Sequence, residues 1–199
     1  MAGKRSLQGI VLCSSVVFAV GCNKTDNSKA NYQSAINNYY KAHPACLWTE
    51  AKKFPVQETT SDESKTEGYD ALTDAGLLTR STAEKKVFIV ASKQVNNYDV
   101  SDKGRAVWTQ DPSQPGYGNF CYGHREVTSI DSFAPTNAPM PGQNAVLVNY
   151  HYKMTDLAPW ANSQEMRTAF PSLNGTTSDP QPAQATLVLR GDSWQVAGQ

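Results

Sequence analysis

Apolar residues recur at helical spacing in the first part of the chain. Between residues 30 and 42 the apolar and aromatic positions fall at i, i+3, i+4, i+7 and i+8, which predicts an amphipathic helix. His43-Pro44 should end this helix, because proline lacks a backbone donor and disfavours helical backbone before it. A second helix is predicted at residues 69–78, with Gly76 as its C-terminal cap. The polar stretch between them, residues 57–67, is predicted to be a surface loop.

Alternation of apolar and polar residues dominates the rest of the chain. Strands are predicted at residues 86–95, 105–109, 120–133, 145–154, 183–190 and 193–196. The last two should form a hairpin that turns at Gly191-Asp192. Short helical segments are expected at residues 156–161 and 163–170, with Ser163 as an N-cap. A proline-rich connection is predicted at residues 134–143.

These elements predict an α+β fold in which N-terminal helices precede a mostly antiparallel β-sheet. Residues 30–199 are long enough to form one domain with a hydrophobic core. Within it we expect a helical part at residues 30–109 and a β-rich part at residues 110–199.

The first 21 residues have the organisation of a secretory signal peptide. Lys4 and Arg5 precede an apolar run at residues 7–20, and the end of this run overlaps a small-residue cleavage site, Ala19-Val20-Gly21. The run is shorter than the roughly 20 apolar residues that a membrane-spanning helix needs. We therefore predict that residues 1–21 are removed and that the mature chain is exported.

Ala19-Val20-Gly21-Cys22 resembles the lipobox of bacterial lipoproteins. The resemblance implies that Cys22 receives diacylglycerol and fatty acid such as palmitate, becomes the mature N-terminus, and anchors the chain to a membrane. Residues 22–29 would then be a lipidated tether. The family usually has leucine where this chain has Ala19, which leaves ordinary cleavage before Cys22 open. Asn23 follows the cysteine where the inner-membrane retention signal has aspartate, which implies the outer membrane, facing the periplasm.

Two further segments resemble the pattern of winged-helix domains. They are Ala71-Leu72-Thr73-Asp74-Ala75-Gly76-Leu77-Leu78 and Tyr98-Asp99-Val100-Ser101-Asp102-Lys103-Gly104-Arg105. The resemblance implies a winged-helix-like shape for residues 69–108, although Val100 and Ser101 replace the usual leucine and threonine. Asp70 and Asp74 lie where a DNA-binding helix would be basic, and they would repel phosphates.

The charge balance gives no electrostatic attraction to nucleic acid. The chain has 18 basic and 18 acidic residues, and removal of Lys4 and Arg5 with the signal leaves a net charge of −2. A protein that binds DNA or RNA through phosphate contacts carries a basic patch instead. We therefore expect no nucleic-acid partner.

Two cysteines remain after Cys13 leaves with the signal and Cys22 is lipidated. In an oxidising compartment, Cys46 and Cys121 would most simply form a disulfide. Two alternatives stay open. The first is a Cys₂His₂ metal site of His43, Cys46, Cys121 and His124, since each cysteine has a histidine three residues away. The second is a pair of free thiols.

Aromatic residues gather in the C-terminal third of the sequence. Tyr150, Tyr152, Trp160, Phe170 and Trp194 are interpreted either as core residues or, where they are exposed, as a contact patch. No catalytic, phosphate-binding or dinucleotide-binding motif accompanies them. The sequence thus favours a cell-envelope lipoprotein without a cofactor, a non-enzymatic interaction module for envelope proteins. The alternative is a small periplasmic metal-binding protein or enzyme using the Cys₂His₂ cluster, which leaves enzyme status undecided.

Overall fold

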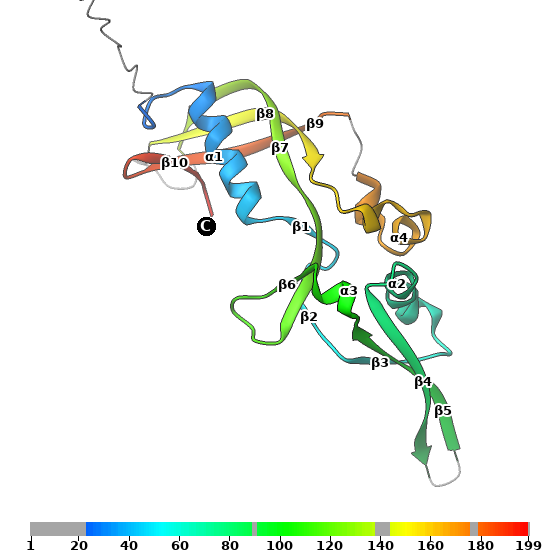
Figure 1. Cartoon of the computed structure of the whole chain (residues 1–199). Coiled ribbons are helices and arrows are strands. Elements are labelled where there is room, and N and C mark those ends of the chain that lie inside the picture. Colours follow the sequence, from blue (N-terminus) through cyan, green and yellow to red (C-terminus); the bar gives the residue numbers. More distant parts are fainter. Residues whose placement is uncertain (1–22, 89–90, 138–143, 176–178, 199) are drawn as a thin grey trace, which may run out of the picture.

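The computed structural model describes residues 23–88, 91–137, 144–175 and 179–198. The predicted signal peptide and Cys22 lie outside these residues, as does most of the predicted connection at 134–143. The described chain is elongated, with a lobe at each end (Figure 1). Two separate clusters of buried apolar residues form the cores of these lobes. None of the helices in the described residues is long and apolar enough to cross a membrane.

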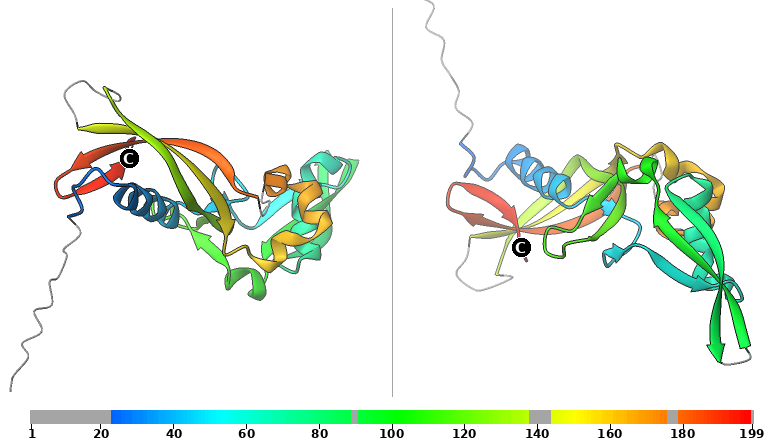
Figure 2. Two further views of the ribbon diagram at one scale, coloured as in Figure 1. Left: turned by 90° about the horizontal axis from the view of Figure 1, so that it is seen from above. Right: turned by 60° about the horizontal axis from the view of Figure 1, so that its bottom comes forward.

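The sheet lobe is one helix packed on a curved antiparallel sheet (Figure 2). The helix is α1 (Lys29–Ala42), and the sheet has the order β7-β8-β9-β10. Its strands are β7 (Tyr117–Thr136), β8 (Ala145–Thr155), β9 (Gln181–Arg190) and β10 (Ser193–Val196). Tyr32 and Ile36 of α1 are fully buried in one core cluster with Val148 and Leu187 of the sheet. This buried apolar stripe is what the helical spacing at residues 30–42 predicted.

The hairpin lobe combines a small sheet with short helices. It contains β3 (Val56–Thr59), α2 (Glu63–Asp74), β4 (Leu78–Phe88), β5 (Ala91–Val100), α3 (Asp102–Arg105), η1 (Pro159–Asn162), α4 (Gln164–Ala169) and η2 (Pro171–Gly175). β5 lies between β3 and β4 in an antiparallel three-stranded sheet. Leu72, Tyr98 and Met166, from α2, β5 and α4, are completely buried in its core.

The 20-residue strand β7 connects the two lobes. Its first part pairs with β1 (Ala45–Cys46), β2 (Lys52–Lys53) and β6 (Trp108–Gln110), and its later part pairs with β8. Register shifts between Val127 and Ser129 and between Ile130 and Ser132 interrupt the pairing with β8. Such bulges bend and twist a strand. A single strand thereby contributes Phe120 to one core and Val127 to the other.

The α+β class and the mostly antiparallel pairing are confirmed. The prediction that helices precede the sheet is wrong, because η1, α4 and η2 lie between β8 and β9. After β8 the chain returns to the hairpin lobe, where these short helices bury Met166 and Leu173. The boundary between the two cores does not follow the predicted division into residues 30–109 and 110–199. Helix α1, from the first part, packs on the C-terminal strands.

Several local predictions are confirmed to within a residue or two. They are α1, β8, the hairpin of β9 and β10, and the cap of α4, where the Ser163 hydroxyl accepts from the Met166 amide at 3.2 Å. Gly191, in the closing turn, has a φ of 57°, a left-handed conformation that glycine adopts without strain.

Three predictions are wrong. Residues 57–67 are not a loop but contain most of β3 and the start of α2. The helix α2 is mostly polar because it buries only Thr66, Ala71 and Leu72, so its sequence lacks a clear apolar stripe. Residues 86–95 are not one strand, because β4 ends at Phe88 and β5 begins at Ala91. An apolar run that crosses a hairpin gives no sign of the turn. Residues 105–109 are divided between α3 and β6.

Candidate functional site

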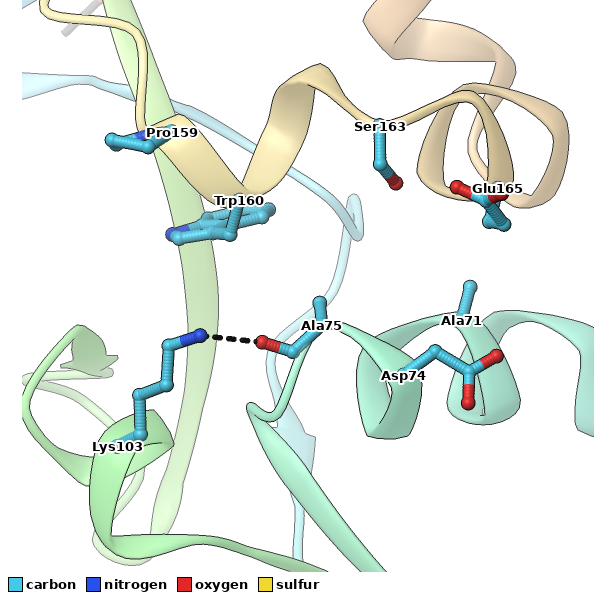
Figure 3. A pocket seen from close by; sticks show the side chains of 8 residues that line it. All are labelled: Ala71, Asp74, Ala75, Lys103, Pro159, Trp160, Ser163 and Glu165. Carbon is cyan, nitrogen blue, oxygen red and sulfur yellow. Dashed lines mark hydrogen bonds between the residues drawn. The ribbon is translucent and has the colours of Figure 1, made fainter.

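An open cleft of about 680 Å³ lies in the hairpin lobe between α2 and the η1–α4 segment (Figure 3). Its lining comprises Ala71, Asp74, Ala75, Lys103, Pro159, Trp160, Ser163 and Glu165. Trp160 lies over Ala75 and Lys103 at one end, and Glu165 faces Ala71 and Asp74 at the other. The cleft therefore has an aromatic end and an acidic end.

The end of α2 and the start of α3 are held together by a set of short hydrogen bonds. Gly76, with a φ of 75°, ends the helix, and its carbonyl accepts from the Ser101 hydroxyl at 2.7 Å. The same hydroxyl caps α3 by accepting from the Gly104 amide at 2.9 Å. Gly104 also packs so closely on the Leu77 carbonyl that an added Cβ would clash with it. The two segments that resemble the winged-helix pattern thus meet here.

Lys103 is positioned by this arrangement. Its ammonium donates to the Ala75 carbonyl at 2.7 Å, where α2 ends (Figure 3). The C-terminus of a helix carries partial negative charge, so a cation there is favourable. Lys103 therefore stabilises the end of α2 and also lines the cleft.

The opposite wall is fixed by the chain that leaves β8. The Ala158 amide donates to the Tyr122 carbonyl of β7 at 2.9 Å, and Pro159 begins η1. Trp160 packs edge-to-face against Phe120, with ring centroids 6.1 Å apart. The Trp160 Nε1 atom is buried and has no hydrogen-bond partner in the described part of the chain. It lies at the end of the ring away from Ser163 and Glu165, so the cleft carboxylates do not satisfy it.

A second hollow of about 550 Å³ continues the acidic end of the cleft between α2 and α4. Its acidic residues are Glu67, Asp70, Asp74 and Glu165. Asp70 pairs with Arg80 of β4 at 2.6 Å and accepts from the Tyr98 phenol at 2.8 Å. Burial, and then the hydrogen bond to Asp70, raises the pKa of Tyr98 above its ordinary value. The charge of Asp70 is thus compensated by Arg80 within the fold. Glu67, Asp74 and Glu165 therefore determine the negative charge of the cleft and the adjoining hollow.

A disulfide joins Cys46 of β1 to Cys121 of β7, as the sequence predicted. This bond uses both sulfurs that the metal alternative requires. His43 instead stacks on Tyr39, with ring centroids 4.2 Å apart. His124 lies 3.2 Å from the Thr155 hydroxyl. No group of three or more histidine, cysteine, aspartate or glutamate side chains that could hold a metal occurs among the residues described.

The five aromatic residues of the proposed contact patch do not form one patch. Tyr150, Tyr152 and Trp194 belong to the sheet-lobe core, whereas Trp160 and Phe170 belong to the hairpin-lobe core. Tyr150, Phe170 and Trp194 are buried. The interpretation as core residues is confirmed, but for two separate cores. The alternative of one shared contact patch fails, because residues close in the C-terminal sequence pack into opposite lobes. Only Trp160 lines the cleft.

The residues that follow Cys22 are docked on the sheet lobe. The Asn31 side-chain amide donates to the carbonyls of Asn23 and Asp26 at 2.8 and 2.9 Å. The Trp194 Nε1 donates to the Thr25 carbonyl at 3.2 Å, and the Ser28 hydroxyl caps α1. The chain therefore emerges from the sheet lobe, at the end of the molecule opposite the β4–β5 hairpin (Figure 1).

No protein-family model, curated protein or solved structure matches this chain. The function is therefore argued from the residues and geometry above.

Proposed function

We propose that the mature chain is a cell-envelope lipoprotein that acts by binding a partner rather than by catalysis. The lipobox-like sequence supports attachment through acylated Cys22 at the outer membrane, facing the periplasm. The carrying observation is that residues 23–28 are docked on the sheet lobe, while the cleft lies in the other lobe. An anchor at Cys22 would hold the sheet lobe at the bilayer and direct the hairpin lobe away from it.

The cleft chemistry favours a cationic segment of another envelope protein. Glu67, Asp74 and Glu165 supply negative charge along facing helices, and Trp160 supplies an aromatic face at the end of the cleft. Lysine and arginine side chains interact favourably with both kinds of group. Lys103 is less of an obstacle than a free cation, because its ammonium is bound to the Ala75 carbonyl.

The winged-helix resemblance contributes a proposal about shape only. The second half of α2, the strands β4 and β5, and α3 follow one another within residues 69–108. Gly76 and Gly104 lie where the two segments that resemble the winged-helix pattern meet. Asp70 and Asp74 on α2 support a partner other than nucleic acid.

Anchoring is tested by fractionating cells that make the chain with and without Cys22→Ser. Wild-type protein should sediment with membranes and partition into detergent, and the variant should be released in soluble form. One acyl chain binds only marginally, whereas two or three anchor firmly. Soluble wild-type protein would refute anchoring.

Partner chemistry is tested separately with a defined probe, an octalysine peptide titrated into the soluble Cys22→Ser protein. Asp74→Asn with Glu165→Gln should weaken binding about three- to tenfold, since exposed charge pairs contribute up to about 1 kcal/mol each. Glu126→Gln with Asp192→Asn removes the same charge from the sheet lobe and serves as the matched control. Equal weakening by both pairs, or no binding at low salt, would refute a role for the cleft without touching the anchoring result.

A further inference from the structure

The outer edge of β4 is a second surface that could bind another chain, because it is an edge strand. In the three-stranded sheet β5 is central, and β3 covers it only as far as the pair Thr59–Val95. Beyond that pair β4 and β5 continue to the pair Phe88–Ala91 as a two-stranded ribbon. In the described chain no strand pairs with the other edge of β4. A two-stranded hairpin alone is marginally stable, and a free edge is a template for another strand.

The side chains of β4 make this edge complementary to itself in one antiparallel register. If Thr82 of one copy lies opposite Thr82 of another, Arg80 lies opposite Glu84 on both sides of the two-fold axis. Directly opposite residues in an antiparallel pair point to the same face, so the two charges meet. Arg80 is 45 % exposed despite its contact with Asp70, and Glu84 is exposed.

Neighbouring registers lack this match. A two-fold axis between antiparallel strands must pass through a residue, because successive side chains alternate faces and opposite residues share a face. An axis at Ala83 places Arg80 opposite Lys86. An axis at Ser81 places Arg80 opposite Thr82, which leaves its charge unpaired. Like charges placed directly opposite are destabilising. The charge pattern therefore selects the register centred on Thr82.

We propose that two copies of this chain associate through their β4 edges, antiparallel and two-fold symmetric about Thr82. The two three-stranded sheets then become one six-stranded sheet, and residues 79–85 form the shared centre. The hairpin projects beyond the rest of the molecule (Figures 1 and 2), which leaves room for a second copy along it. This pairing is independent of the cleft and of its partner.

Sedimentation equilibrium of the soluble Cys22→Ser chain tests the pairing. Dimers should form below about 100 μM, and Glu84→Arg should weaken them about tenfold or more, because both symmetric pairs become repulsive. Arg80→Glu should do the same, with circular dichroism to verify that loss of the Asp70 contact leaves the fold intact. The decisive sample is an equimolar mixture of the two variants, which should form heterodimers because each copy then carries one sign of charge. A monomeric wild type, or a mixture that stays monomeric, would overturn the proposal.

The register is tested by oxidative cross-linking. Thr82→Cys should form an intermolecular disulfide, because each copy places this residue on the two-fold axis. Ser81→Cys is the matched control. In the proposed register residue 81 of one copy lies opposite Ala83 of the other, so the two introduced cysteines are farther apart than at position 82. Cross-linking that is equal at both positions would contradict the proposed register, and preferential cross-linking at Ser81 would establish a different one.

Discussion

Removal of the Cys46–Cys121 disulfide should cost a large part of the stability of the fold. The bond joins residues 75 apart in sequence, and β1, which carries Cys46, is only two residues long. In the chain-entropy model a closed loop of this length restricts the unfolded state by about 4.5 kcal/mol at 25 °C. Domains typically have an unfolding free energy of 5–15 kcal/mol.

The test is urea denaturation of the Cys46→Ala/Cys121→Ala protein beside the oxidised wild type. We expect the midpoint to fall and the slope of free energy against urea to rise, because the unfolded chain without the cross-link exposes more surface. Wild type under reducing conditions is the matched control and should unfold like the double variant. A loss below about 1 kcal/mol in both samples would refute the argument that this bond limits the unfolded chain.

Three other changes test the packing described above. Ile36→Ala should lower the free energy of unfolding, measured by urea denaturation, by about 2–5 kcal/mol, because Ile36 is fully buried against the sheet. A decrease below about 1 kcal/mol would contradict that packing. Gly104→Ala should lower the free energy of unfolding by about 1–3 kcal/mol, because the added Cβ would clash with the Leu77 carbonyl. The clash lies beside Lys103, so the variant should also bind octalysine more weakly. An unchanged free energy of unfolding would show that Gly104 packs less closely on Leu77. Burial, and then the hydrogen bond to Tyr40, raises the pKa of Tyr150, so the folded state holds this proton more tightly than the unfolded state. Its contribution is therefore complete below about pH 10 and is lost as pH rises above that value toward the folded pKa. Tyr150→Phe should flatten the decline in unfolding free energy above about pH 10. An identical decline in both proteins would contradict this assignment.

The sequence predicts elements best where burial imposes a regular pattern. α1 buries a single stripe and β8 alternates, so their periodicity is visible. α2 is mostly polar and buries little, so its first half resembles a loop. The β4–β5 turn is concealed because apolar residues continue from Val87 to Ala91 on both sides of it.

The arrangement of the two lobes depends on contacts that sequence order does not indicate. β7 contributes to both cores, and the chain returns from β8 to the hairpin lobe before β9. Cys46 and Cys121 could be paired from the sequence because only these two cysteines remain if Cys13 and Cys22 are used as predicted. The cleft could not be predicted, since Glu165 and Lys103 come from distant segments. The sequence contains one indication of the cleft, the two segments around Gly76 and Gly104 that resemble the winged-helix pattern. The contact between these segments positions Lys103 in the cleft wall.

The most direct test of the account is the intact mass of the protein purified from membranes of cells that make it. We predict a chain that begins at Cys22, carries the mass of a diacylglyceryl group with or without a further acyl chain, and is two hydrogens lighter than the reduced form because of the Cys46–Cys121 bond. A chain that retains Met1, or one that begins at an unmodified Cys22, would contradict the proposed anchoring.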